Sequence, residues 1–99
     1  MLKENKSLIG EIVSLKLTTA EEVIGKITSE TDETFVVNRP LALGPMPDGR
    51  AGAGLFPWLL SGKTDDVVVN KTTIIGFSHT TEEVAQKYIE STTNIQIVK

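Results

Sequence analysis

Apolar and polar residues alternate in two stretches near the start of the chain, at 8–17 and 22–29. A period of two residues is typical of strands that bury one face. The faces expected to be buried carry Ile9, Val13, Leu15 and Leu17, and then Val23, Gly25 and Ile27. A glycine in mid-strand permits the sharp bend of a sheet that curls into a barrel, although an ordinary sheet also tolerates it. Gly25 therefore favours a small closed barrel.

A third alternating stretch, 34–43, follows an acidic turn at 30–33, and together they predict a hairpin with the second strand. Its apolar face carries Phe35, Val37, Leu41 and Leu43. Arg39 interrupts this face, and Pro40 predicts that the strand bends or reaches a sheet edge there. The Gly- and Pro-rich residues 44–53 lack the glycine spacing of a phosphate-binding loop, so we interpret them as a flexible connection.

The run 54–60 contains the only tryptophan and is apolar in five of its seven positions. Pro57 has no backbone N–H and does not fit inside a central strand. We therefore expect an edge or bent strand, antiparallel to the third strand, whose side chains are buried against another part of the structure. A buried or interface position is favoured for Phe56 and Trp58, with base stacking as the alternative.

Two short strands rich in β-branched residues are expected at 67–69 and 73–77, around a small polar turn. Thr80 followed by Glu83 forms a capping box, which predicts a helix over 81–91. A last short strand is expected at 94–98.

Five or six short strands and one terminal helix predict a small, mainly antiparallel barrel or roll. The barrel is expected to span about 8–78, within a single domain that covers 1–99. A chain of 99 residues with 39% hydrophobic content has room for one modest core.

Composition excludes several kinds of site. The chain has no cysteine, which excludes disulfides and thiolate metal sites. The net charge of −3 argues against a broad basic surface for nucleic acid, although not against a small basic pocket. The apolar run near the N-terminus is too short for a signal peptide or a membrane span, and a reducing cytoplasm fits best.

Nothing in the chain predicts an enzyme. His79 is the only histidine and is interpreted as a surface or capping residue. The adjacent carboxylates at 32–33 and 65–66 have the chemistry to bind a hard cation or to act as acid and base, but both pairs lie in turn sequences. We predict no catalytic residue, no metal and no cofactor.

Two polar clusters are candidates for binding. Asn70, Lys71 and Thr72 offer an amide, an ammonium and a hydroxyl group to base edges or a phosphate, and the alternative is an ordinary hairpin turn. Asn38-Arg39 places a charge within an apolar strand face. That charge requires a partner, either a carboxylate across a strand or subunit, or a ligand phosphate.

Together these segments resemble the Sm-like (LSm) proteins, and more closely the short Sm-like proteins encoded by marine cyanophages. The general resemblance covers about 9–77 and rests on the strands 10–17 and 21–27, on Asp32 with the later Asn38 and Leu41, and on the strand–turn–strand 67–77. The phage-type resemblance adds 38–41, 56–59 and the helix that ends near Tyr88.

The resemblance implies a strongly bent, five-stranded antiparallel barrel with a C-terminal helix. It also implies a ring of about five to seven subunits joined edge to edge, which would cover unpaired apolar edges. In the family, single-stranded RNA binds around the pore through the turn after the second strand and the turn between the last two strands. Asp32 matches the family's turn aspartate, and Asn70 and Lys71 occupy the place of its second turn. Glu33 and Thr34 follow Asp32 where the family has an aromatic residue.

We therefore expect a non-enzymatic, ring-forming protein of the cytoplasm (of the host, if phage-encoded) that binds single-stranded nucleic acid, RNA in particular, in RNA or DNA processing. The expected contact residues are Asp32, Asn38, Arg39, Asn70, Lys71 and Thr72, and the expected oligomer interface is Leu55, Phe56, Trp58 and Leu59. The alternative is a phage structural or protein-interaction module that docks through the run 54–60.

Overall fold

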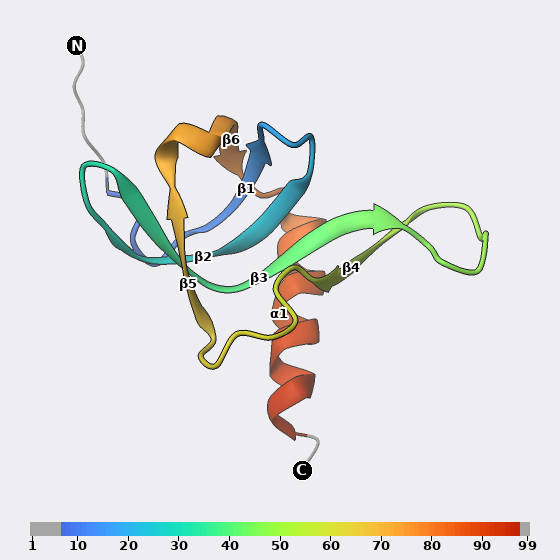
Figure 1. Ribbon diagram of the computed structural model, residues 1–99. Coiled ribbons are helices and arrows are strands. Elements are labelled where there is room, and N and C mark those ends of the chain that lie inside the picture. The colour runs from blue at the N-terminus through green and yellow to red at the C-terminus, as the bar shows by residue number, and fades with distance from the viewer. Residues whose placement is uncertain (1–6, 98–99) are drawn as a thin grey trace.

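The fold is mainly β with one C-terminal helix, as the sequence predicts (Figure 1). The computed structural model describes the backbone of residues 7–97 and the side chains of residues 7–93. Along the chain the elements are β1 (Ile12–Leu17), β2 (Glu22–Glu30), β3 (Thr34–Pro45), β4 (Ala53–Pro57), β5 (Asp66–Asn70), the 3-10 turn η1 (Lys71–Thr73), β6 (Ile74–His79) and α1 (Glu82–Ile97).

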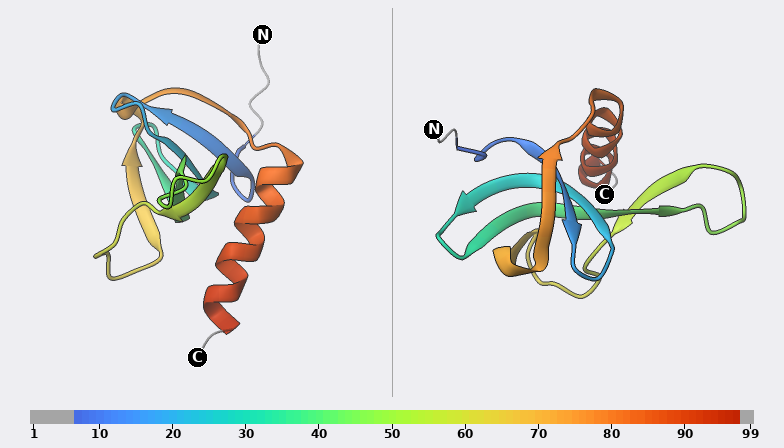
Figure 2. Two further views of the ribbon diagram at one scale, coloured as in Figure 1. Left: turned by 90° about the vertical axis from the view of Figure 1, so that its right-hand side faces the viewer. Right: turned by 90° about the horizontal axis from the view of Figure 1, so that it is seen from above.

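The strands form one antiparallel sheet in the order β4-β3-β2-β1-β6, and β5 also pairs with β3. β3 has twelve residues, and the edge of β3 that faces away from β2 pairs with two strands in turn. It pairs with β5 along 34–38 and with β4 along 41–45. The three residues of η1 connect β5 to β6, so the sheet curls round on itself (Figure 2). Among the described strands no pairing joins β5 to β6. The sheet of the described residues therefore has six strands, rather than the five of the expected barrel, and it is curled but not closed.

The main core lies inside the curl. Its buried side chains are Val13, Leu15, Leu17, Val23, Ile27, Phe35, Val37 and Val69. The inward faces predicted for the first two strands are thus confirmed, except at Ile9, which precedes β1 and is exposed. Burial of these apolar side chains is the main favourable contribution to folding.

The alternation of β3 changes face at Arg39, so the expectation of a single apolar face is wrong. Phe35 and Val37 point into the main core, whereas Leu41 packs on the opposite face of the sheet with Ile24. In a regular strand residues two and four positions apart share a face. An extra residue in β3 therefore reverses the direction of every side chain that follows.

That extra residue forms a bulge opposite Gly25. Arg39 and Pro40 together face Gly25 in the β2–β3 ladder, and Arg39 has a left-handed backbone with φ of +49°. The two backbones approach so closely that a Cβ on Gly25 would overlap the side chain of Val37 and lie 3.3 Å from the main-chain oxygen of Asn38. Gly25 thus permits the bend, as predicted, because only a residue without a side chain fits.

Helix α1 covers the outer face of the sheet. Tyr88 is buried there against Ile24 and Leu41, and Ile12, Leu43, Leu55 and Val84 surround this second cluster. β2 is therefore buried on both faces at Val23 and Ile24, which alternation alone does not predict.

The helix differs from its predicted bounds at both ends. Thr81, one residue after the predicted cap, accepts a hydrogen bond from the N–H of Val84, while the hydroxyl of Thr80 pairs with that of Ser14. At the other end, α1 continues to Ile97, so the strand predicted at 94–98 is wrong for 94–97, and Val98 lies outside the described residues. The hydroxyl of Thr92 donates to the carbonyl of Tyr88, one turn earlier, so this β-branched residue is accommodated within the helix.

Candidate nucleic-acid interface

Two turns distant in sequence lie side by side at one end of the curled sheet. The first is the β2–β3 turn at 31–33, and the second is η1 with the preceding Asn70. Thr34 stands opposite Asn70 in the β3–β5 ladder, and the N–H of Lys71 donates a 2.8 Å hydrogen bond to the carbonyl of Glu33. Four of the predicted contact residues therefore share one surface, namely Asp32, Asn70, Lys71 and Thr72.

Thr31 holds the β2–β3 turn in place. Its hydroxyl oxygen accepts hydrogen bonds from the N–H groups of Glu33 and Thr34, at 3.2 and 3.0 Å, and lies 2.8 Å from the hydroxyl of Thr34. Such local side-chain bonds replace the ladder contacts that turn residues lack. The side chain of Asp32 is exposed at the tip.

Lys71 crosses from one turn to the other. Its ammonium lies 2.6 Å from a carboxylate oxygen of Glu30 and 4.8 Å from the centre of the Phe35 ring. The ion pair and the cation–π contact together position this side chain. Phe35 belongs to the main core, so its ring supports Lys71 rather than offering a stacking surface to a base.

Asn70 and Thr72 offer exposed hydrogen-bonding groups on η1. The carbonyl of Asn70 accepts a 2.7 Å hydrogen bond from the hydroxyl of Thr73, and the carbonyl of Thr73 accepts one from the N–H of Thr18 at 2.8 Å. These bonds fix the backbone of the turn. An amide and a hydroxyl on a fixed turn are suited to the edges of unpaired bases.

The charge of this surface is negative. Glu30, Asp32 and Glu33 contribute three carboxylates against the single ammonium of Lys71, which is already paired with Glu30. Phosphate groups are repelled by such a surface. The turns are therefore better suited to contacts with base edges than to contacts with the phosphate backbone.

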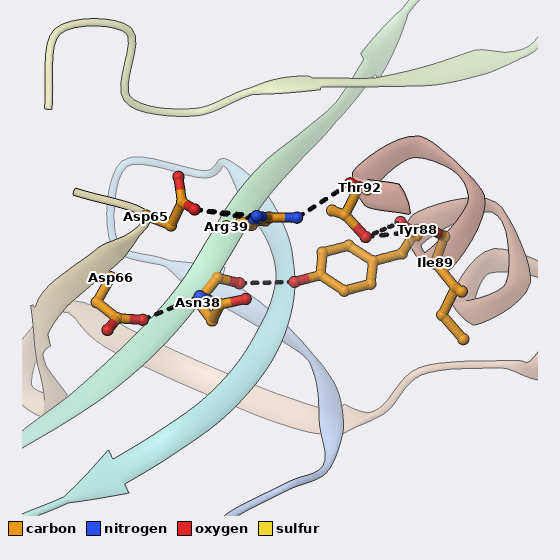
Figure 3. A network of polar contacts seen from close by, with 7 residues as sticks. All are labelled: Asn38, Arg39, Asp65, Asp66, Tyr88, Ile89 and Thr92. Carbon is orange, nitrogen blue, oxygen red and sulfur yellow. Dashed lines mark hydrogen bonds and ion pairs between the residues drawn. The ribbon is translucent and has the colours of Figure 1, made fainter. Parts of the chain in front are cut away.

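Asn38 and Arg39 do not join this surface, because they lie at the bulge of β3. The guanidinium of Arg39 contacts Asp65 at 3.1 Å and donates to the carbonyl of Thr92 at 3.0 Å (Figure 3). The side-chain amide of Asn38 donates to Asp66 at 3.0 Å. Of the partners considered for Arg39, the structure thus contains a carboxylate of the same subunit, that of Asp65 in the loop just before β5.

Tyr88 completes the network around the bulge. Its hydroxyl donates a 2.6 Å hydrogen bond to the main-chain oxygen of Asn38 (Figure 3). Burial raises the pKa of the Tyr88 phenol, and the backbone N–H of Lys26 and the charge of Arg39 oppose this rise only in part. The phenol therefore remains a hydrogen-bond donor at neutral pH.

The residues predicted for the oligomer interface contribute mainly to packing within the subunit. Leu55 belongs to the cluster under α1, and Trp58 packs against the main core. Phe56 is half-buried, with its ring beside Gly54. Leu59 is 50% exposed. The run 54–60 does return antiparallel to β3 as predicted. The strand itself, however, begins at Ala53 and ends at Pro57, so the last three residues of the run lie beyond it.

Further exposed apolar side chains lie on β5 and β6. Val68 in β5 is 65% exposed, and Ile75 and Phe77 in β6 are 65% and 57% exposed. Phe77 stands opposite Leu15, so it lies on the inward side of the sheet without being covered. The high content of β-branched residues at 67–77 predicted these strands, but it does not identify which edge is left open.

The described residues contain no group of three or more His, Asp or Glu side chains placed to hold a metal ion. His79 is exposed, as expected for a surface residue, and lies 3.8 Å from Glu11.

Comparison with known proteins identifies no family for this chain. The chain matches no protein-family model and no curated protein. Within the described residues, no helix combines the length and apolar character needed to cross a bilayer.

Proposed function

We propose that this chain is a non-enzymatic Sm-like protein that forms a homo-oligomeric ring and binds single-stranded nucleic acid, RNA in particular. The observation that carries the proposal is the path β5-β3-β2-β1-β6, whose two outer strands are joined by η1. A bent five-stranded sheet is what the resemblance to Sm-like proteins implies. On this proposal β4 is an additional strand, which pairs with the C-terminal part of β3.

The two open edges of the sheet support ring assembly. β5 pairs only with β3, and β6 only with β1, among the described strands. Their outer edges differ, so pairing β5 of one subunit with β6 of the next is a head-to-tail contact, which closes into a ring when the rotation fits. The contact would cover Val68, Ile75 and Phe77, whose exposure otherwise invites aggregation.

The two adjoining turns support nucleic-acid binding, and a ring would repeat them around its axis. Asn70 and Thr72 would contact base edges, and Lys71 would contribute one charge that is partly neutralised by Glu30. We therefore expect modest affinity with a shallow dependence on salt, because few phosphates are neutralised.

Two measurements test this function. Light scattering and native mass spectrometry are expected to give one closed oligomer. Anisotropy titrations with oligo-U and oligo-A at low salt are expected to show binding that Asn70→Ala and Lys71→Ala weaken by about fivefold. Lys63→Ala is the charge-matched control, because Lys63 lies in the loop between β4 and β5, away from both turns. A monomer, or an absence of binding at low salt, would contradict the proposal.

A protein-interaction module is the second candidate, favoured by the negative charge of the turns. Leu59 and Leu60, the exposed end of the run 54–60, would then form the docking surface. Pull-downs from host or phage lysate after nuclease treatment separate the two functions. Partners that survive the nuclease and are lost with Leu60→Ser indicate protein docking, and Leu60 is preferred to Trp58 for this variant because Trp58 packs on the main core.

A further inference from the structure

A groove of about 650 Å³ lies between the β3–β4 hairpin and α1. The hairpin projects from the sheet beside the helix (Figure 2). The apolar lining consists of Leu43, Met46, Leu55 and Val84, and each of these side chains is only half-buried. Leu43 and Leu55 are cross-strand neighbours, so they present one continuous apolar surface to the groove.

The helix side of this groove is acidic. Glu83, Lys87 and Glu90 line it from one flank of α1, at positions that follow one another along the helix surface. All three side chains are exposed. Two carboxylates against one ammonium favour a ligand with positive charge, and they disfavour a nucleic-acid backbone.

The strand side offers backbone groups. β4 is the terminal strand of the sheet order, and it lines the groove with Ala53, Gly54 and Leu55. Its outer N–H and C=O groups have no partner strand among those described. An extended peptide can pair with such an edge and place alternate side chains in a neighbouring pocket.

We propose that this groove binds an extended segment of a partner protein in which one or two large apolar side chains are flanked by Lys or Arg. The apolar residues occupy the space between Leu55 and Val84, and the basic residues face Glu83 and Glu90. The groove is built from β3, β4 and α1, and it uses neither β5 nor β6. The inference therefore stands independently of ring formation and of nucleic-acid binding.

Selection from random dodecapeptides displayed on phage tests this inference, with the full chain as the immobilised target. We expect enriched peptides with a large apolar residue flanked by Lys or Arg. A synthetic enriched peptide then gives dissociation constants by anisotropy. Glu83→Lys and Glu90→Lys are expected to weaken binding by about fivefold each, and Lys87→Glu to strengthen it by a similar factor.

Glu82→Lys is the matched control, because Glu82 lies in the same first turn of α1 but does not line the groove. Its effect is expected to stay below about twofold. Met46→Ser tests the apolar contribution to binding, because Met46 lies in the loop between β3 and β4. This variant is expected to weaken binding by about tenfold, and circular dichroism checks that it keeps the fold. No enrichment, enrichment without basic residues, or equal effects of Glu82→Lys and Glu83→Lys would each overturn the proposal.

Discussion

The hydroxyl of Tyr88 donates a 2.6 Å hydrogen bond to the main-chain oxygen of Asn38, a residue fifty positions earlier in the chain. Arg39, the next residue of β3, donates in turn to the carbonyl of Thr92, one helical turn beyond Tyr88. The helix is thus attached at two successive points to the bulge where β3 reverses its faces. The bend of the sheet and the position of α1 are therefore coupled through the same few residues.

Replacing Tyr88 by Phe tests this attachment. The variant loses the hydrogen bond and leaves the oxygen of Asn38 without this partner, so we expect it to be less stable by about 1–2 kcal/mol at neutral pH. Unfolding in urea, followed by the fluorescence of Trp58, measures the difference. An unchanged midpoint would show that the hydrogen bond contributes nothing to stability.

The same variant predicts a pH dependence. Because the pKa of Tyr88 is raised in the folded state above its ordinary value of 10.0, its contribution is complete below that value and is lost as pH rises through the folded pKa. The wild type should therefore lose stability above about pH 10 more steeply than Tyr88→Phe does. The gap between the two proteins narrows with rising pH. A gap that stays constant between neutral and alkaline pH would contradict the raised pKa.

Gly25→Ala is expected to destabilise the fold by about 2–3 kcal/mol, because its Cβ would overlap Val37 next to the backbone of the bulge. Gly76→Ala is the control: it adds the same methyl group to another strand, where no atom lies within 4 Å of the new Cβ. Its effect should stay within about 0.5 kcal/mol. Thermal unfolding of both variants decides the question. Equal effects would indicate a general cost of the methyl group rather than close packing at the bulge.

Phe77→Asp and Leu59→Asp distinguish the two surfaces on which subunits could join. The two side chains are similarly exposed, at 57% and 50%, and each variant adds one negative charge. If rings form through β5 and β6, Phe77→Asp is expected to give monomers by light scattering, while Leu59→Asp leaves the oligomer intact. The reverse outcome would assign assembly to the run 54–60. Dissociation of the oligomer in both variants would indicate that neither surface is sufficient alone.

Glu30→Gln tests how the ion pair with Lys71 limits binding. Removing the carboxylate frees the ammonium, so we expect oligo-U to bind about three- to fivefold more tightly at low salt. Glu33→Gln removes the same charge, but Glu33 contacts Lys71 only through its main-chain carbonyl. A larger effect of Glu30→Gln than of Glu33→Gln indicates that the pair itself matters. Equal effects would indicate a response to net charge alone.

Local patterns were sufficient for most of the elements. The inward residues of β1 and β2, the return of the run 54–60 beside β3, and the existence of the helix all follow from alternation, turn residues and capping. The helix bounds did not follow, because a threonine-rich stretch has no Gly or Pro to stop it, and Thr92 bonds back to the helix. For the candidate site, the resemblance placed Asp32 and Lys71 on two contact turns, and the structure brings these turns side by side. It did not indicate that Glu30 pairs with Lys71.

The sequence by itself determined a mainly antiparallel β fold with one C-terminal helix, because period and turn chemistry act between residues close in the chain. Tertiary structure alone decided three things: that β3 changes face at Arg39, that α1 lies on the outer face, and that the charges of Arg39 and Lys71 meet carboxylates. The contacts of Arg39 and Lys71, including the attachment of α1, depend on partners 26 to 53 residues away, and the change of face depends on Gly25 in the neighbouring strand. A bulge needs the opposing Gly25, and an ion pair needs both strands in place, so neither is encoded in any one segment.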